Sequence, residues 1–512
     1  GVASTENIRT NTNATFLQNI NVGVAITAGK LGIGFTDTNV KVGSTALDSL
    51  TTGTNNTAVG HNALTANTTG TRNTAVGSEA LDANTTGDDN VAIGRNSLGA
   101  NTTGYRNVSM GRGSMMSNTT GSHCTAIGAY TLSSQTTAGD ANVAMGYGAL
   151  YSNTTGDNNT GIGNSALVNN TTASNNTALG FKALAENTTG TQNIAVGTYA
   201  LDANTTANSN VAMGYNGLGA NTTGDQQTAV GTYALQANTT GIQNSAFGST
   251  ALYSNTTASN NTAVGFAALY SNTTGNTSTA VGGYALEDCT DGVGNTFVGY
   301  YAGTWRSTGS YNTCVGHEAG RGATNAAGGA QATGDSNTCV GRGAGEDLRS
   351  GSNNLLLGRE AGKNASPSGT ISTHDHRICL GNNDITNAYI KVDWTVTSDR
   401  RDKTDIEPFN HGLSWINKLN PVTYRWDNRS NYEDGVPDGS KKGTQLNVGL
   451  IAQDELEVEK EHGYGDTPDN MLVTDVNGDG DYGMQYSKLV PILINAVKEL
   501  SAKVEELESK LN

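Results

Sequence analysis

Two short segments near the end of the chain carry residue types that bind metal ions. His374 and His376 flank Asp375, and on a β-strand two residues separated by one position point to the same side. Three copies of the chain around an axis would then supply six imidazole nitrogens for an octahedral metal ion. The same residues also fit a solvated loop, so a metal site at His374 and His376 and a plain loop are both open interpretations.

The second segment, residues 475–481 (DVNGDGD), has the acidic spacing of the first half of an EF-hand calcium loop. Position 12 of such a loop supplies a bidentate glutamate, but here that position is Tyr486. An acidic turn is therefore the better interpretation. Apart from the axial metal ion, we expect no cofactor.

The C-terminal segment is patterned as a coiled coil. Its apolar residues alternate in steps of four and three, which is the spacing of a coiled-coil seam. The seam residues are Leu493, Val497, Leu500, Val504, Leu507 and Leu511. A helix with such a seam is expected to associate with other copies of itself.

Four motifs in this part of the chain occur in a recognisable order. They are 398–403 (SDRRDK), 419–426 (LNPVTYRW), 449–453 (GLIAQ) and 486–493 (YSKLVPIL), and the last runs into 496–500 (AVKEL). In these motifs residues 398–512 resemble the intramolecular chaperone domain of phage tail fibres and tailspikes, the self-cleaving family called peptidase S74. A serine and a lysine at this spacing are common by chance, so the order of the motifs carries the resemblance.

The resemblance implies a chaperone that forms trimers and then releases itself by cutting between Thr397 and Ser398. It assigns Ser398 as the nucleophile and Lys403 as the group that accepts its proton. A lysine accepts a proton only when neutral, and its pKa in water is about 10.4, so burial or a nearby cation must lower it. We therefore expect assembly to create the catalyst and each chain to cut once, with no activity on other proteins. Attack within one chain and attack on another chain both fit the sequence.

Composition and charge limit the classes of function. Of the 512 residues, 35% are hydrophobic and 6% are aromatic, which argues against one large core. The net charge of -16 disfavours binding to nucleic acid. Because no apolar run is long enough to span a bilayer and no signal peptide is visible, we expect no membrane insertion. The chain begins at Gly1 rather than methionine, so we expect an upstream part.

A 17-residue repeat begins at Gly43, and the first 366 residues contain no proline, since all six prolines lie at or after Pro367. Its unit reads NTAVG, two variable residues, AL, two more, then NTTG, as in residues 73–87. Two apolar pairs separated by turn residues predict two strands and two turns per repeat, with stacked coils burying a narrow core. The anchor glycines are Gly43, Gly60, Gly77, Gly94, Gly111, Gly128, Gly146, Gly163, Gly180, Gly197, Gly214, Gly231, Gly248, Gly265, Gly282, Gly299 and Gly316, followed after insertions by Gly341, Gly358 and Gly381.

The recurrent Asn-Thr-Thr segment has three interpretations. Asn67, Asn84 and their equivalents begin N-glycosylation sequons. Alternatively, each side chain bonds to its copy in the next coil, forming an Asn/Thr ladder. Threonine rows on a flat solenoid can also bind ice. The strict register favours the ladder.

From Gly299 onward the unit changes, because the Ala-Leu pair becomes Ala-Gly, as at Gly303, and aromatic residues such as Tyr300 and Tyr311 concentrate. Loss of leucine should thin the core, so we expect different packing here. With the insertions at 317–340 and 359–380, this segment is predicted to be a distal tip that recognises a saccharide or a protein. An ordinary transition into the C-terminal region fits almost as well.

Three cysteines of this segment replace the alanine two residues before an anchor glycine, and we expect them to point into the core. They are Cys314, Cys339 and Cys379. Five scattered cysteines in the whole chain fit a reducing cytoplasm better than a disulfide framework.

These patterns predict a mainly β protein in four parts. Residues 1–42 form an N-terminal β connector, 43–298 the shaft of stacked repeats, 299–397 the variant repeats of the tip, and 398–512 an α+β chaperone and autoprotease that ends in a coiled-coil helix. The NTAVG signature is also similar to the β-roll repeats in the heads of trimeric bacterial adhesins, although those repeats are usually shorter. Both resemblances imply a homotrimeric fibre.

The function predicted from these resemblances is that of a phage tail fibre. Such a fibre would belong to the virion, be assembled in the cytoplasm of the host bacterium, join tail or baseplate proteins upstream, and bind a glycan or protein receptor on the host surface. A bacterial surface adhesin is the alternative, and it would need a signal or an anchor. A tailspike that degrades glycans would need two carboxylates facing a cleft, and the repeats offer no such cluster.

Overall fold

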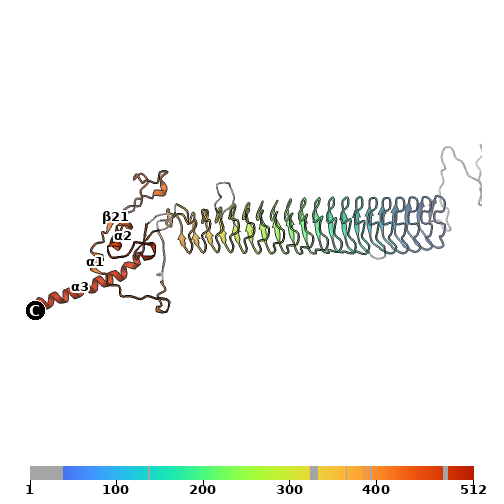
Figure 1. Ribbon diagram of the computed structural model, residues 1–512. Helices are drawn as coiled ribbons and strands as arrows, with labels where there is room; N and C mark the ends of the chain where they lie inside the picture. Colours follow the sequence, from blue (N-terminus) through green and yellow to red (C-terminus); the bar gives the residue numbers. More distant parts are fainter. Residues whose placement is uncertain are drawn as a thin grey trace, which may run out of the picture. The chain divides into compact units, whose positions relative to one another are not determined.

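The computed structural model describes residues 38–136, 139–322, 332–364, 366–385, 387–391, 395–476 and 482–511 (Figure 1). Most of the predicted N-terminal connector, residues 1–37, lies outside this range, as does the core of the first long insertion, residues 323–331. The chain divides into two compact units, Gly1–Asn142 and Val143–Asn512. Each unit is described by itself.

In the described residues of the first unit, short strands recur at the period of the sequence repeat. Each strand pairs in parallel with the next, and equivalent repeat positions lie side by side, as Thr57 does with Thr74. This arrangement is a parallel β-solenoid. Its strands are β1 (Val40–Val42), β2 (Thr57–Val59), β3 (Thr74–Val76), β4 (Val91–Ile93), β5 (Val108–Met110) and β6 (Thr125–Ile127).

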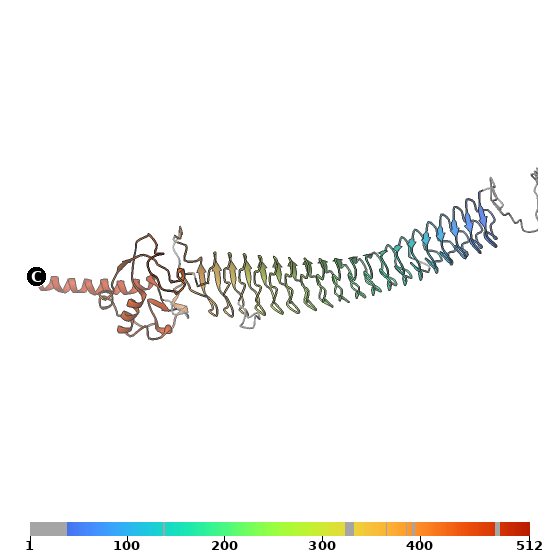
Figure 2. The ribbon, with the colours of Figure 1, turned by 90° about the horizontal axis from the view of Figure 1, so that it is seen from above.

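The second unit contains the same kind of solenoid, and Figure 2 shows its strands side by side in chain order. The strands are β7 (Val143–Met145), β8 (Thr160–Ile162), β9 (Thr177–Leu179), β10 (Ile194–Val196), β11 (Val211–Met213), β12 (Thr228–Val230), β13 (Ser245–Phe247), β14 (Thr262–Val264), β15 (Thr279–Val281), β16 (Thr296–Val298), β17 (Thr313–Val315), β18 (Thr338–Val340), β19 (Leu355–Leu357) and β20 (Ile378–Leu380). The prediction of a mainly β chain of stacked repeats is therefore confirmed.

Each coil has one strand, so the prediction of two strands per repeat is wrong. The second apolar pair lies in a turn, where the leucine takes a left-handed backbone, with φ of 52° at Leu64. The backbone still bonds from coil to coil there, because Leu64 N donates to Ala80 O at 3.0 Å. The anchor glycine that precedes this turn is required, since a Cβ on Gly60 would lie 2.3 Å from Gly77 O.

Asparagine and threonine ladders run through the solenoid, as the register of the repeat predicts. Asn84 Nδ2 donates to Asn67 Oδ1 at 2.9 Å and to Gly87 O at 3.1 Å. On the outside of the same turn, Thr68 Oγ1 donates to Thr85 O at 3.1 Å. Because the asparagine side chains are fully buried, the folded coils cannot offer them for glycosylation. The ladder interpretation is confirmed.

The variant coils after Gly299 keep the register of the earlier coils, and β16 to β20 pair in the same parallel way. The expected thinning of the core does not occur, because a larger residue in the strand fills the space left by the leucine. A Cβ on Gly303 would lie 2.5 Å from the ring of Phe297, and one on Gly362 would lie 2.9 Å from Leu356. The predicted inward orientation of the cysteines is confirmed, since all of them are buried and free.

The C-terminal region mixes short helices with two antiparallel hairpins. Its hydrophobic core surrounds Trp415 and includes Val458, Val473, Leu489 and Ile492. The elements are η1 (Arg400–Asp402), α1 (Leu413–Ile416), β21 (Val422–Tyr424), η2 (Arg429–Asn431), β22 (Asn447–Gly449), α2 (Ala452–Glu461), η3 (Pro468–Asn470), β23 (Thr474–Val476), β24 (Tyr482–Met484), η4 (Tyr486–Lys488) and α3 (Leu489–Leu511).

Helix α3 is anchored only by its first half. Asn495 Nδ2 donates to Phe409 O at 2.6 Å, and Glu499 Oε2 accepts from Leu413 N at 2.9 Å. The backbones approach so closely here that a Cβ on Gly412 would lie 2.6 Å from the backbone nitrogen of Ala496. From residue 501 onward the helix is exposed on all sides. None of the helices in the described parts of the chain is long and apolar enough to cross a membrane.

Candidate functional site

A short 3-10 turn, η1, sets the geometry of the predicted catalytic residues. Asp399 caps the turn, because its Oδ1 accepts from Arg401 N at 2.9 Å. The Arg401 guanidinium also pairs with this carboxylate at 2.6 Å, and that hydrogen bond lowers the pKa of Asp399. Lys403 N closes the turn by donating to Arg400 O at 3.3 Å. The turn thus returns the chain toward residue 398.

The turn brings the two predicted catalytic side chains together. Lys403 Nζ donates to Ser398 Oγ at 2.5 Å, and Thr397 supplies the carbonyl of the adjoining peptide bond. All three residues are exposed in the single chain. The pair therefore has the contact that proton transfer needs, but it lacks the dry surroundings that would favour a neutral amine.

Three of the other motifs meet beside the core of the C-terminal region. The motif at 419–426 contains β21, which pairs with β22 at the start of the motif at 449–453. Tyr486, from the motif at 486–493, accepts a hydrogen bond from Leu450 N at 3.0 Å through its hydroxyl. Residues far apart in the sequence therefore form one folded unit, as expected for a domain defined by these motifs together.

Residues 398–464 match the family model of the chaperone of endosialidase, Peptidase_S74. The chain thus carries a Peptidase_S74 chaperone domain at its C-terminal end, after a β-solenoid of stacked repeats. The family is one of self-cleaving intramolecular chaperones. The matched residues include the first three motifs, whereas the motif at 486–493 and the rest of α3 follow the match. No curated protein matches the chain.

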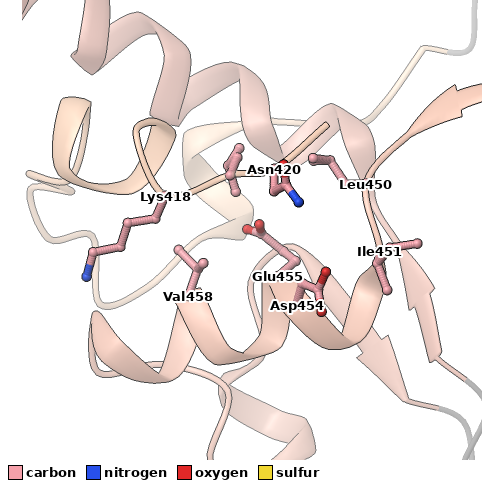
Figure 3. A pocket seen from close by; sticks show the side chains of 8 residues that line it. Lys418, Asn420, Leu450, Ile451, Asp454, Glu455 and Val458 are labelled. Atoms are coloured by element: carbon pink, nitrogen blue, oxygen red, sulfur yellow. The ribbon is translucent and has the colours of Figure 1, made fainter. Parts of the chain in front are cut away.

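The Peptidase_S74 domain also contains a buried carboxylate that the sequence analysis did not single out. Glu455 lies on α2, and its Oε1 accepts from Trp415 Nε1 at 2.8 Å. Its other oxygen has no partner among the described residues, and burial raises the pKa of this carboxyl. Figure 3 shows Glu455 directed into a small hollow between α2 and Asn420, which has room for about one water molecule. The apolar residues Leu456 and Val458 close to Glu455 in the sequence are the signal that could have found it.

Glu459, one turn further along α2, holds the following hairpin in place. Its carboxylate accepts from the backbone nitrogens of Leu472 at 3.2 Å and Thr474 at 2.7 Å, and from Val473 as well. Both glutamates thus serve the core of the domain. Their hydrogen-bond partners in the described residues are Trp415, Leu472, Val473 and Thr474, and not Ser398.

Two histidines that could replace Lys403 as a base lie in the aromatic cluster around Trp415. The rings of His411 and His462 are 5.1 Å apart, and His462 stacks on Trp415 at 4.7 Å. His462 is also bonded through Nδ1 to Val458 O at 2.7 Å. His462 Nε2 also lies 3.3 Å from Ser414 Oγ, whereas Lys403 is the residue whose side chain bonds to Ser398.

The structure corrects the premise of the predicted metal site. His374 and His376 lie in the turn before β20 rather than on a strand, and His376 has a φ of 59°. Asp375 between them accepts from Ser352 N at 2.6 Å. Within the described residues of one chain, no three His, Cys, Asp or Glu side chains form a metal-binding group. A shared metal ion on an axis stays a prediction. Residues 477–481 of the acidic turn lie outside the described residues.

Proposed function

We propose that the chain is the subunit of a homotrimeric tail fibre or tailspike, and that its Peptidase_S74 domain aligns three copies and then cuts between Thr397 and Ser398. The observation that carries the proposal is the contact of Lys403 Nζ with Ser398 Oγ. Ser398 is the first residue of the family match, and the peptide bond between Thr397 and Ser398 directly precedes it. A nucleophile beside a potential base is the arrangement that covalent catalysis requires.

In the proposed reaction, neutral Lys403 takes the proton of the Ser398 hydroxyl. Ser398 Oγ then bonds to the carbonyl carbon of Thr397, the carbon–nitrogen bond breaks, and the nitrogen released from it takes a proton. Water hydrolyses the resulting ester and leaves a carboxylate on Thr397. An exposed lysine is protonated at neutral pH, so we propose that the closing of the trimer around the turn removes water and produces the neutral amine. Cleavage would then report correct assembly.

The outer surface of the strands supports association along the solenoid. The last residue of each strand points outward and is apolar in every coil described. We call the row in each unit its strand-end column. In the first unit the residues are Val42, Val59, Val76, Ile93, Met110 and Ile127, and in the second they are Met145, Ile162, Leu179, Val196, Met213, Val230, Phe247, Val264, Val281, Val298, Val315, Val340, Leu357 and Leu380. An apolar row without a charge, repeated in this way, is typical of a surface that is covered in the assembled protein.

The C-terminal helix supports the same conclusion independently. The predicted seam residues of α3 are all exposed in one chain, from Leu493 at 45% to Leu511 at 85%. A seam of this kind is stable when it packs against the same seam of other copies. We propose that three copies associate first through α3 and then along the strand-end column, because non-local parallel pairing is slow without alignment.

We further propose that the released solenoid attaches the particle to its host and belongs to the virion after assembly in the bacterial cytoplasm. The exposed aromatic residues Tyr300 and Tyr311 in the variant coils support a surface for recognition. Upstream residues would join tail or baseplate proteins.

A denaturing gel of freshly expressed full-length protein tests the proposal. We expect two fragments, residues 1–397 and residues 398–512, in place of one chain of 52.7 kDa. Ser398→Ala should leave one uncut chain. Lys442→Ala, which removes another exposed lysine of the domain, is the matched control and should cut normally. An uncut wild-type trimer would contradict the proposed cleavage.

A further inference from the structure

Aromatic side chains form two runs of neighbouring rings along the coils of the second unit. Adjacent rings from Phe181 to Tyr270 have centroids 5.0 to 6.2 Å apart, and a second run from Phe266 reaches His317. We call these residues the aromatic spine: Phe181, Tyr199, Tyr215, Tyr233, Tyr253, Tyr270, Phe266, Tyr284, Tyr300 and Tyr301.

The repeat explains how the spine forms. Most of its residues follow an anchor glycine by one or two positions, so successive coils place them one above another at about 4.8 Å. The residues directly after the glycine, such as Tyr215 and Phe266, are exposed to between 37% and 51%. Those one position later, such as Tyr233 and Tyr284, are half-buried and contact them edge to face. The half-buried rings thus hold the exposed rings in place.

The aromatic spine differs from the strand-end column in the number of coils that it covers. A surface that covers every coil in the assembly should have the same character in every coil, and the strand-end column does. The spine instead begins at Phe181 and ends near His317. At the two equivalent positions the coils from Gly43 to Gly111 carry residues such as Glu79, Arg95 and Arg112, and of the coils between them and Phe181 two carry an aromatic residue there, Tyr130 and Tyr147. A feature confined to part of a regular repeat indicates a local function rather than packing.

The chemistry of the spine indicates its ligand. At the same two positions, the coils from Thr198 to Tyr301 carry aromatic, Thr, Ser, Asn, Ala and Gly residues and no charged side chain, whereas the coil of Phe181 carries Lys182, which lies over the Phe181 ring. In a chain with a net charge of -16, such an uncharged strip does not select for charged ligands. Exposed rings beside hydroxyl and amide groups suit a ligand with apolar faces and polar edges. A sugar ring has this character.

We infer that the aromatic spine is a binding site for a neutral polysaccharide that lies along the coils and stacks sugar rings on the exposed aromatic residues, which recur every two or three coils. The inference rests on the attachment role proposed above, because that role makes the surface of the host bacterium the source of the polysaccharide. It places recognition on the side of the solenoid, before most of the variant coils at 299–397.

The test applies the full-length protein to an array of bacterial surface polysaccharides, both neutral and acidic. We expect retention on neutral polysaccharides and weaker binding to acidic ones. The triple variant Tyr215→Ala, Phe266→Ala and Tyr300→Ala should bind at least about tenfold more weakly, because each replacement removes one stacking surface. Tyr105→Ala is the matched control, since Tyr105 is exposed at 43% but lies in the first unit, outside the spine, and it should bind like the wild type.

Size-exclusion chromatography of the same variants shows whether the spine is instead a contact between copies. The triple variant should keep the oligomeric state of the wild type. A change of that state, binding equal to that of the wild type, or no retention on any neutral polysaccharide would overturn the inference. Failure of the proposed cleavage would show separately, as an uncut chain on the denaturing gel.

Discussion

Lys403 Nζ lies 2.5 Å from Ser398 Oγ, although both side chains are open to solvent in the single chain. The local turn alone is sufficient to form this contact, since its stabilising bonds all lie within residues 399–403. Geometry and activation are therefore separate requirements. The fold of one chain meets the first, and we propose that the trimer meets the second.

Ser398→Ala and Lys403→Ala should each give full-length, folded and uncut trimers. The first removes the nucleophile and the second removes the proposed base. Wild-type cleavage should become faster as pH rises, because more of the lysine amine is neutral. Time courses on denaturing gels at several pH values measure both effects. Normal cutting in Lys403→Ala would redirect the search for a base to His411 or His462.

Deletion of residues 398–512 should leave an insoluble solenoid. Without the Peptidase_S74 domain, parallel pairing between distant residues is slow, and the strand-end column stays exposed during folding. Fractionation of cell lysates, followed by sizing of any soluble protein, measures the outcome. The uncut Ser398→Ala protein is the control, because it keeps the domain and should be soluble. A soluble trimer of residues 1–397 made without the domain would disprove this role.

The buried cysteines should be unreactive toward Ellman's reagent at pH 8 until the protein is unfolded. Burial raises the pKa of the Cys289 thiol to about 11 and that of Cys314 well above its usual value. Because these folded-state pKa values are raised, their contribution to stability is present below about pH 8.5 and is lost as pH rises toward 11. In the Cys289→Ala variant, the free energy of unfolding should fall less between about pH 8.5 and 11 than it does in the wild type. Rapid labelling of native protein would contradict the burial.

Arg306→Met should increase thermal stability. Arg306 occupies a ladder position that Asn272 fills in an earlier coil, and it is fully buried. Its Nη2 donates to Gly334 O, but Nε and Nη1 have no partner in the described residues. Removing this charge while keeping most of the volume should stabilise by on the order of 2 kcal/mol.

The half-time of unfolding at elevated temperature, compared between variants, measures this effect. Arg306→Lys keeps the buried charge and is the control, so it should give no gain. A shorter half-time for Arg306→Met than for the wild type would show that the guanidinium stabilises the coil.

The repeating architecture could be predicted from the sequence because each coil rests on a near copy of itself. Equivalent positions then meet, so the period and the recurrent asparagines are sufficient to predict the stack and the Asn67–Asn84 ladder. The motifs of the Peptidase_S74 domain were likewise visible in the sequence, because they are local and ordered. The pairing of Ser398 with Lys403 came from the resemblance, and the contact between them agrees with it.

Other features depend on tertiary contacts and could not be predicted. A left-handed backbone at Leu64 costs roughly 1–2 kcal/mol locally, and burial and the bond to Ala80 in the next coil offset that cost. The same kind of contact places Phe297 in the space above Gly303 and arranges the aromatic spine across coils. The sequence by itself determined the period, the ladder and the domain motifs. Tertiary structure decided the single strand per coil and the filling of the core, because these depend on what the neighbouring coil provides.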